Sequence, residues 1–137
     1  MPDSRLKITV HAGASAISPE QWNRCANPPG LPYNPFLDHA FFTALESSGS
    51  AVPETGWTAC HLTLDGAAGE ILGLMPCYLK DHSQGEYVFD WGWADAYERA
   101  GGSYYPKLQS AVPFTPATGP RLLVPAGPDK LARQGLL

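Results

Sequence analysis

The chain has 137 residues, of which 44% are apolar and 16% are charged, and its formal net charge is −4. This length is enough for one domain with a buried core, and the composition excludes a disordered chain. Because the net charge is negative and no run of Lys or Arg occurs, the sequence excludes a general attraction to nucleic-acid backbones or anionic membranes. We therefore expect no DNA partner.

The cysteines and the first residues indicate a cellular location. Cys25, Cys60 and Cys77 are odd in number, widely spaced and in no CxxC pair. This spacing argues against a disulfide framework or a zinc site and favours a reducing, cytoplasmic environment. The N-terminus lacks a basic-then-apolar leader, and no apolar run approaches the roughly 20 residues that span a bilayer. We expect a cytoplasmic protein without a membrane span.

The first half of the chain predicts one strand and two helices. Residues 5–11 alternate apolar and polar side chains, which is typical of a half-buried strand. Ser18 as N-cap and Pro19 at the first helical position predict a short helix through about Cys25. The apolar residues of the strand are Leu6, Ile8 and Val10.

A second helix is predicted after a proline-rich connector. It begins after Asn34-Pro35 and ends at Gly49, a residue suited to the left-handed position that follows a helix. Its apolar residues fit one helical face. These are Leu37, Phe41, Ala44 and Leu45, with Phe42 at the edge of the stripe.

A β-hairpin follows the helices. Residues 57–64 alternate, a turn lies at 65–69, and residues 70–80 return as the second strand. The returning strand is apolar on both faces at 72–75, which predicts a central place in the sheet. Pro76 lacks an N–H group, so it predicts a bulge or a local break in the pairing.

The last third of the chain mixes short extended segments with turns. Residues 87–89 predict a short strand, and WADAYERAG (93–101) predicts a short helix closed by glycine. Residues 110–114 and 121–124 are expected to be extended on either side of a proline-rich turn. A last helix is predicted to begin at Asp129.

The predicted order is strand, helix, helix, strand, strand, irregular insert, strand and the start of a helix. Two antiparallel strands after a helix pair favour a mixed α/β (α+β) fold over a doubly wound one. We expect a largely antiparallel sheet flanked by helices, in one domain over residues 1–137.

Residues 86–124 combine rings, charges and turn residues more densely than the rest of the chain. Core strands seldom carry this mixture, because every buried polar tip or charge needs a partner. The segment is therefore predicted to bind a ligand. Its rings and charges are Tyr87, Trp91, Trp93, Tyr97, Tyr104, Tyr105, Asp90, Asp95, Glu98, Arg99, Lys107 and Arg121.

Asp90, Trp91, Trp93 and Asp95 form the first candidate binding group. In the functional interpretation they form a wall for a polar, cationic acceptor, with rings for cation–π contact and carboxylates for charge. In the structural interpretation the tryptophans cover the edge of the sheet, while an aspartate caps the following helix. Both interpretations stay open at the level of sequence.

Tyr104, Tyr105 and Lys107 form a second group. A tyrosine or lysine can serve as acid or hydrogen-bond donor in acyl transfer. Packing of the rings over the insert is the alternative, since nothing in the sequence fixes their geometry.

A third group, Thr115, Thr118 and Arg121, lies near the turn before the last helix. Arg121 can bind a phosphate or carboxylate through two N–H groups. Alternatively, it pairs with Asp90 or Glu98 and fixes the insert to the sheet.

Other familiar sites are not predicted. His39, His61 and His82 form no HxH or HxxxH pair, which argues against a metal site. The absence of a GxSxG motif excludes a serine-hydrolase reading. Cys60 and Cys77 lie in apolar strands, where a buried thiol is inert.

Four stretches of the chain resemble a known family. They are NPFLDHAFFTALESSGS, the hairpin GWTACHLTL–ILGLMPCYLK, HSQGEYVFDWGWADAYERAG and YYPKLQSAVPFTPATGPRLLV, which together cover nearly all of residues 34–124. The chain resembles the predicted N-acyltransferases of the GNAT superfamily that are related to Fem-type peptidoglycan-bridge aminoacyltransferases. Its order of elements matches the first half of the GNAT fold.

The resemblance implies an N-terminal GNAT-like domain, incomplete at the C-terminus and truncated within its central helix. It implies transfer of an acyl or aminoacyl group to a small-molecule or peptide amine. The alternative is a non-catalytic substrate-binding or scaffolding module of such a protein. We expect this chain to be inactive alone and to self-associate through an unpaired sheet edge.

The resemblance also implies an acyl donor, either acyl-coenzyme A or aminoacyl-tRNA, near the start of the last helix. The chain departs from the coenzyme A pattern, because no Gln/Arg-x-x-Gly-x-Gly/Ala precedes that helix and Pro125 and Pro128 lack N–H donors. We therefore expect no firmly bound cofactor. On this view five residues shape the acceptor side, and the catalytic residues stay unassigned. The five are Asp90, Trp93, Tyr105, Lys107 and Arg121.

Overall fold

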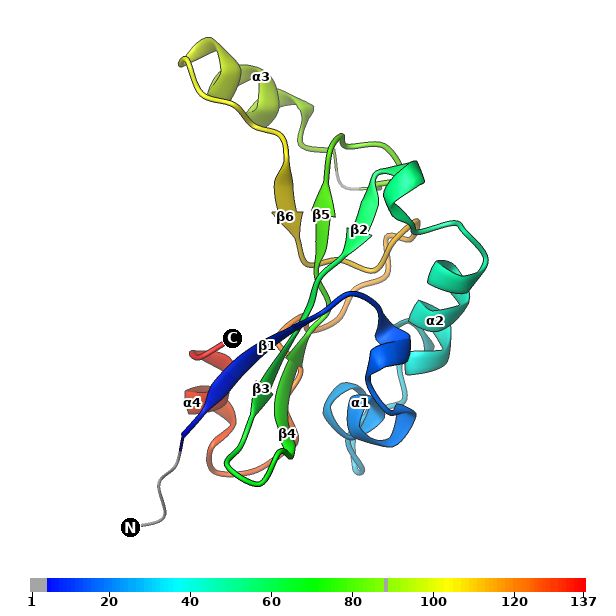
Figure 1. The fold of residues 1–137 in the computed structure, drawn as a ribbon, viewed down its shortest axis with the longest axis vertical. Coiled ribbons are helices and arrows are strands. Elements are labelled where there is room, and N and C mark those ends of the chain that lie inside the picture. The colour runs from blue at the N-terminus through cyan, green and yellow to red at the C-terminus, as the bar shows by residue number, and fades with distance from the viewer. Residues whose placement is uncertain (1–4, 88) are drawn as a thin grey trace.

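A computed structural model describes residues 5–87 and 89–137. Strands occupy the middle of the molecule, with α1 and α2 on one side and α4 on the other, while α3 projects at one end (Figure 1). The strands are β1 (Lys7–His11), β2 (Trp57–Ala59), β3 (His61–Asp65), β4 (Ile71–Met75), β5 (Tyr78–Lys80) and β6 (Lys107–Gln109). The helices are α1 (Pro19–Ala26), α2 (His39–Ser47), α3 (Trp91–Arg99) and α4 (Lys130–Gln134), with 3₁₀ turns η1 (Ala14–Ala16), η2 (Pro35–Leu37) and η3 (Pro53–Thr55).

One long hairpin forms the middle of two antiparallel sheets. Strands β3 and β4 belong to a first sheet of order β1-β3-β4, and their continuations β2 and β5 belong to a second sheet of order β2-β5-β6. The two arms break at Cys60 and at Pro76-Cys77, where the Cys60 N–H donates to the Cys77 carbonyl (2.9 Å). Both the predicted hairpin and the predicted break at Pro76 are confirmed.

Different parts of the chain cover the two faces of the first sheet. On one face, α1 and α2 place the rings of Trp22 and Phe42 at 5.4 and 5.9 Å from the His61 ring. On the other face, Gly73 lies against the side chain of Leu137, and a Cβ atom at Gly73 would lie 3.0 Å from Leu137 Cδ1, so the leucine would have to shift slightly. The sheet is therefore a middle layer between the helix pair and the C-terminal segment.

Strand β1 is confirmed, but its apolar side is not the buried one. Val10 is 62% exposed, whereas Thr9 and His11 face β3 partners. The Thr9 hydroxyl donates to Asp65 Oδ2 (2.5 Å), and a ring nitrogen of His11 lies 2.8 Å from the Thr63 hydroxyl. The alternation was correct, but the cross-strand polar pairs decide which side faces the helices.

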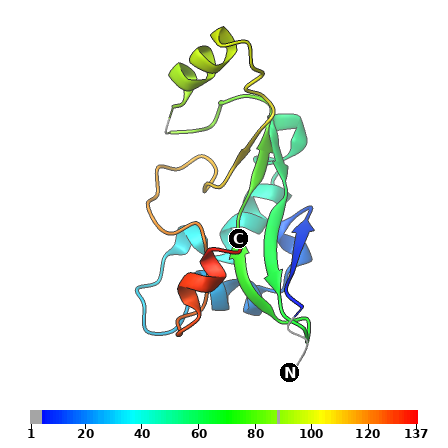
Figure 2. The same cartoon turned by 90° about the vertical axis from the view of Figure 1, so that its left-hand side faces the viewer.

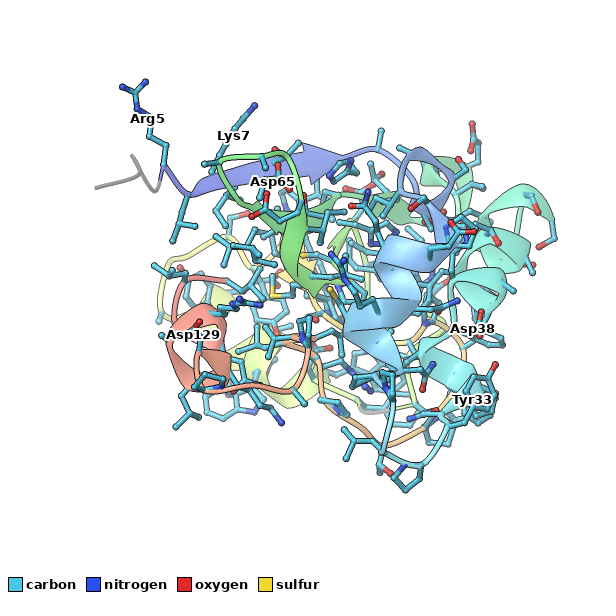
Figure 3. All side chains as sticks on the ribbon, turned by 90° about the horizontal axis from the view of Figure 1, so that it is seen from below. Arg5, Lys7, Tyr33, Asp38, Asp65 and Asp129 are labelled. Carbon is cyan, nitrogen blue, oxygen red and sulfur yellow. The ribbon has the colours of Figure 1, made fainter. Side chains whose placement is uncertain are left out.

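Both predicted helices form, and the second begins later than predicted. Ser18 caps α1 by accepting from the Gln21 N–H (3.2 Å). The chain makes the η2 turn first, and Asp38 then accepts from the Ala40 N–H (2.8 Å), so α2 begins after Asp38. The Tyr33 hydroxyl donates to the other oxygen of Asp38 (2.7 Å), and Figure 3 shows these two side chains together.

The buried face of α2 also differs from the prediction. Phe42 is fully buried, whereas Phe41 is half-buried and Ala44 is exposed. The predicted apolar face was counted from Leu37, which lies in the η2 turn and not in α2. The predicted face is therefore rotated about the helix axis relative to the observed one. With the start at His39, the inward positions follow from His39 through Phe42 to Glu46, three and four residues apart.

The C-terminal third contains a strand that the sequence did not reveal. Strand β6 pairs with β5, whereas the predicted extended segment at 110–114 forms no strand and bends at Phe114 (φ 60°). The predicted extended segment 121–124 is confirmed only at Leu123, which makes an antiparallel bridge to Leu74 of β4, whereas residues 121 and 122 form a bend. Helices α3 and α4 form as predicted, but α3 begins and ends two residues earlier than the predicted 93–101, and α4 begins after Asp129.

The remaining strand prediction, at residues 87–89, is not supported. Tyr87 and Phe89 lie in no strand, and Val88 lies outside the described residues. The fold class is confirmed as a mixed α+β fold in which antiparallel sheets are flanked by helices. Across residues 5–87 and 89–137, the structure has no helix with the length and apolar character needed to cross a bilayer.

We expect Phe42→Ala to lower the free energy of unfolding by about 3–5 kcal/mol, because it removes a fully buried ring that packs against Trp22 and His61. The matched change Phe41→Ala removes a half-buried ring and should cost about half as much or less. Urea denaturation at pH 7 measures both. A larger loss for Phe41→Ala would contradict the observed orientation of α2.

Candidate functional site

The α3 arm, defined as residues 89–105, projects beyond the end of the second sheet (Figures 1 and 2). Its helix is favoured by alanines at 94 and 96 and ends before Gly101, whose φ of 90° suits glycine. Ala94 is buried, but Trp91 and Trp93 are 60% and 76% exposed. The arm therefore presents aromatic rings to solvent and is held to the sheet at its base.

The base of the arm is held by a group that we call the Lys107 cluster. The Lys107 ammonium donates to Ser83 Oγ and Glu86 Oε2 (both 2.9 Å) and also to Asp90 Oδ2. The Lys107 side chain is only 12% exposed. The cluster comprises Ser83, Glu86, Asp90, Tyr104, Tyr105 and Lys107.

The two tyrosines extend the hydrogen bonding around Lys107. The Tyr104 hydroxyl donates to Asp90 Oδ2 (2.6 Å), and the Tyr105 hydroxyl lies 2.5 Å from Ser83 Oγ. The Lys107 Nζ is 5.7 and 5.8 Å from the centroids of the Tyr104 and Tyr105 rings, within the range of cation–π attraction. Each tyrosine thus contributes both a hydroxyl and a ring to the cluster.

Lys80 lies beside the Lys107 cluster, and Glu86 neutralises the repulsion between the Lys80 and Lys107 ammonium groups. Lys80 and Lys107 are directly opposite in the β5–β6 register, where like charges repel. The Glu86 carboxylate lies between them, with Oε1 3.4 Å from Lys80 Nζ and Oε2 2.9 Å from Lys107 Nζ. Lys80 is fully buried, donates to the Gln84 carbonyl (2.8 Å) and stacks 3.6 Å from the Trp57 ring centroid.

The protonation of these groups follows from burial and from their partners. Burial alone would raise the pKa of Asp90, but hydrogen bonds from Lys107 and Tyr104 outweigh it and lower that pKa to about 2. Burial would lower the pKa of Lys107, but Asp90 and Glu86 raise it above its ordinary value. For Lys80 burial prevails and its pKa is lowered. At neutral pH, Asp90 is an anion and Lys107 a cation.

The sequence model of the FemAB-like family, described as peptidoglycan biosynthesis/recognition, matches residues 13–137. The chain belongs to the FemAB-like family. The matched range contains the whole Lys107 cluster and the α3 arm. Neither a comparison with curated proteins nor one with solved structures gave a match for this FemAB-like chain.

The FemAB-like site keeps two carboxylate oxygens unpaired by hydrogen bonds. Among the described residues, Glu86 Oε1 and Asp90 Oδ1 are buried without a hydrogen-bond donor, and the indole Nε1 of Trp57 is buried without an acceptor. Such atoms carry a desolvation cost that a partner would remove. Asp90 Oδ1 therefore keeps unused acceptor positions while Oδ2 holds Lys107.

The structure brings four of the candidate residues together: Asp90, Tyr104, Tyr105 and Lys107. The structure does not support the interpretation in which Trp91 and Trp93 cover the edge of the sheet and an aspartate caps α3. Trp91 and Trp93 point to solvent instead of covering the sheet edge, since the arm carries them beyond it. Asp90 makes no side-chain cap to α3, because its carboxylate is engaged by Lys107.

Asp95 lies apart from the cluster on the exposed surface of α3. Its carboxylate pairs with Arg99 one helical turn later (2.9 Å), and both side chains are more than half exposed. It is therefore not a cap of the helix. Its predicted role in a binding wall with Trp91 and Trp93 stays a prediction.

Arg121 and Thr118 lie in the proline-rich turn and make no contact with the Lys107 cluster among the interactions of the described residues. The Arg121 guanidinium donates to the carbonyls of Ala117, Gly119 and Pro120, so it does not pair with Asp90 or Glu98 as one interpretation proposed. Burial lowers its pKa. The Thr118 carbonyl accepts from Asn34 Nδ2 (3.3 Å). These contacts order the proline-rich turn.

Sequence reasoning missed Lys80 and left Ser83 and Glu86 without a role. The signal for Lys80 was its position two residues after Tyr78 in a short strand, which places both side chains on the buried side. Lys107, the partner that Ser83 and Glu86 share, lies on β6, a strand that was not predicted. Within the described residues, no three His, Cys, Asp or Glu side chains gather closely enough to hold a metal ion.

We expect Asp90→Asn to lower the free energy of unfolding at pH 7 by about 2 kcal/mol, because the Lys107 ammonium loses its charged partner. The pKa of Asp90, about 2 in the folded state, lies below the roughly 3.9 of an unfolded aspartate. The stabilisation is therefore complete above about pH 4 and is lost as the pH falls through 2. Urea denaturation at pH 6 and at pH 2 should show a difference between wild type and variant that shrinks with acid.

Asp95→Asn is the matched control for this change. It breaks an exposed pair with Arg99 on α3 and should cost only about 0.3–0.5 kcal/mol. If both variants lose the same stability, or if the Asp90→Asn loss does not depend on pH, the assigned role of the Asp90–Lys107 pair is wrong.

Proposed function

We propose that this chain forms the acceptor side of a GNAT-like N-acyltransferase, in which an acyl or aminoacyl group moves to the amine of a small molecule or peptide. The family match supports a role connected with peptidoglycan biosynthesis or recognition. The antiparallel sheets flanked by helices are compatible with a GNAT-like domain. Within such a protein, the Lys107 cluster and the α3 arm would bind the amine.

The position of Asp90 is the observation that carries this proposal. Its Oδ1 is buried without a hydrogen-bond donor from the described residues, while its Oδ2 holds Lys107. It lies directly before Trp91 and Trp93, whose rings are largely exposed. A carboxylate oxygen next to exposed aromatic faces is a combination that recognises an ammonium group.

The chemistry of the transfer limits what these residues can do. The amine nitrogen forms a bond to the activated carbonyl, the bond to the donor's leaving group breaks, and a base takes the amine proton. Lys107 is unsuited to be that base because its raised pKa keeps it protonated. Asp90 is a weak base because its pKa is about 2. These residues therefore bind and orient the amine, and the base stays unassigned.

The donor in this proposal is an acyl-coenzyme A or an aminoacyl-tRNA. Both bring an activated carbonyl and an anionic phosphate portion. Arg121 lies before α4 and forms no ion pair within the described parts of the chain, so it offers a cation for such a portion.

A non-catalytic binding module is the second candidate, and the charge balance of the cluster favours it. Lys80 and Lys107 are matched by Glu86 and Asp90. A cluster whose charges cancel is typical of a structural attachment that holds the arm in one orientation. In this case the arm binds the substrate and the chemistry belongs to another part of the assembly.

Trp93→Ala tests the role of the arm in either case. We expect it to weaken binding of an amine-bearing peptidoglycan stem peptide about two- to fivefold, because an exposed cation–π contact contributes about 0.5–1 kcal/mol. Stability should change by no more than about 0.5 kcal/mol, because the Trp93 side chain is 76% exposed. Calorimetric titration gives the affinity, and urea denaturation gives the stability.

Leu131→Ala on α4 is the matched control, since it also removes an exposed apolar side chain. It should leave the affinity unchanged. The activity assay uses the whole N-acyltransferase of which this chain would form the acceptor side, because the chain alone is expected to be inactive. Amide formation from an acyl-coenzyme A or aminoacyl-tRNA donor, lost in Asp90→Asn of that whole protein, would support the transferase. Turnover that is unaffected by Asp90→Asn, with only stability changed, would support the non-catalytic module. A wild-type chain that binds no amine-bearing peptide would refute both.

A further inference from the structure

A second site lies away from the Lys107 cluster, where the end of α2 meets β2. The chain runs from α2 through η3 into β2 on this side of the molecule (Figure 1). A pocket of about 500 Å³ opens here, a size that suits a small organic ligand. No residue of the Lys107 cluster lines it. We call it the Glu46 pocket, after the acidic residue in its lining.

The Glu46 carboxylate is held rigidly by three donors from three different parts of the fold. Oε1 accepts from His61 Nε2 (2.7 Å) and from the Tyr78 hydroxyl (3.2 Å), and Oε2 accepts from the Ala14 N–H (2.8 Å). A carboxylate offers about four acceptor positions, two on each oxygen. The second position of Oε2 is therefore left for a ligand, and the Glu46 side chain is 14% exposed.

The hydrogen bonds of His61 show that this carboxylate has no cationic partner. The Cys77 backbone N–H donates to His61 Nδ1 (3.1 Å), so Nδ1 carries a lone pair and the ring proton sits on Nε2. In this tautomer His61 is neutral. No Lys or Arg within residues 5–87 and 89–137 forms an ion pair with Glu46. The lining of the pocket thus carries a negative charge that no ion pair compensates.

The walls of the pocket fit an aliphatic chain with a polar end. Ala51, Val52 and Pro53 supply apolar surface along one side. Ser15 and Thr58 are also among the residues that line the pocket, and the hydroxyls of both form no hydrogen bond within the described ranges. Apolar walls with one carboxylate suit an organic ammonium group better than a metal ion, which would need several oxygen ligands.

We propose that the Glu46 pocket binds the primary ammonium group of a small alkylamine, with Glu46 Oε2 as the acceptor and the segment 51–53 against the alkyl chain. An ammonium has three donors, so one can bind Glu46 Oε2 and the other two stay available for water or for a further acceptor. The inference does not depend on the proposed function, because the two sites use different side chains.

The test is a titration of the 137-residue chain with n-butylammonium chloride, followed by the amide resonances of Ser47 and Thr58. n-Butanol and butyrate serve as neutral and anionic probes of the same length. We expect saturable shifts with n-butylammonium and at least about tenfold weaker binding of the other two, as for one lost charge-assisted hydrogen bond. Equal binding of n-butanol would overturn the proposal.

Two variants separate ligand binding from a purely structural role of Glu46. Glu46→Gln keeps the size of the side chain and should weaken n-butylammonium about tenfold or more. Ser47→Lys leaves Glu46 in place and adds an ammonium at an exposed position that lines the pocket, so it should also displace the probe.

Ala44→Lys is the matched control for the second variant. It adds the same charge at an exposed position of α2 that does not line the pocket, so it should bind the probe like wild type. Unchanged affinity in a folded Ser47→Lys chain would refute the site, even if Glu46→Gln fails to fold. Equal losses in Ser47→Lys and Ala44→Lys would refute it as well, because they would indicate a general charge effect.

Discussion

The hydrogen bond from the Cys77 N–H to His61 Nδ1 (3.1 Å) is the interaction on which the arrangement of the two sheets depends. The long hairpin breaks at Pro76-Cys77, and a buried backbone N–H at such a break needs a partner. His61 supplies that partner from the facing arm. Its other ring nitrogen donates to Glu46 (2.7 Å), so one fully buried side chain ties the break to α2.

The break also decides what lies beside each half of the hairpin. Before it, β4 bridges to Leu123, which brings the C-terminal segment to the first sheet. After it, β5 pairs with β6, and this register places Lys80 opposite Lys107. Two buried ammonium groups at neighbouring positions need anions, and Glu86 and Asp90 supply them. The orientation of the α3 arm follows, because Asp90 is the residue that precedes its helix.

The sequence predicted what depends on local rules and failed where distant partners decide. Ser18 as a cap, Pro76 as a break and a helix in the region 93–101, observed at 91–99, follow from the chemistry of a few neighbouring residues. The exposed side of β1 did not, because Thr9 finds its partner in Asp65, 56 positions away. Likewise, the sequence marked Asp90 and Lys107 as candidate site residues in two separate groups. Their contact with each other depends on the pairing of β6 with β5, which the sequence did not predict.

The carboxylates of Asp90 and Glu46 differ in whether a cation neutralises them, and this difference suits them to different roles. Asp90 pairs with Lys107, and Glu86 pairs with both Lys107 and Lys80, so the two carboxylates balance the two ammonium groups. The attraction of Asp90 for a ligand cation is therefore partly cancelled. Glu46 receives its hydrogen bonds from a neutral imidazole, a hydroxyl and a backbone amide, which stabilise the anion without cancelling its charge. The Lys107 cluster is therefore suited to fixing the arm and orienting a group brought by the rings. The Glu46 pocket is suited to attracting a cation by itself.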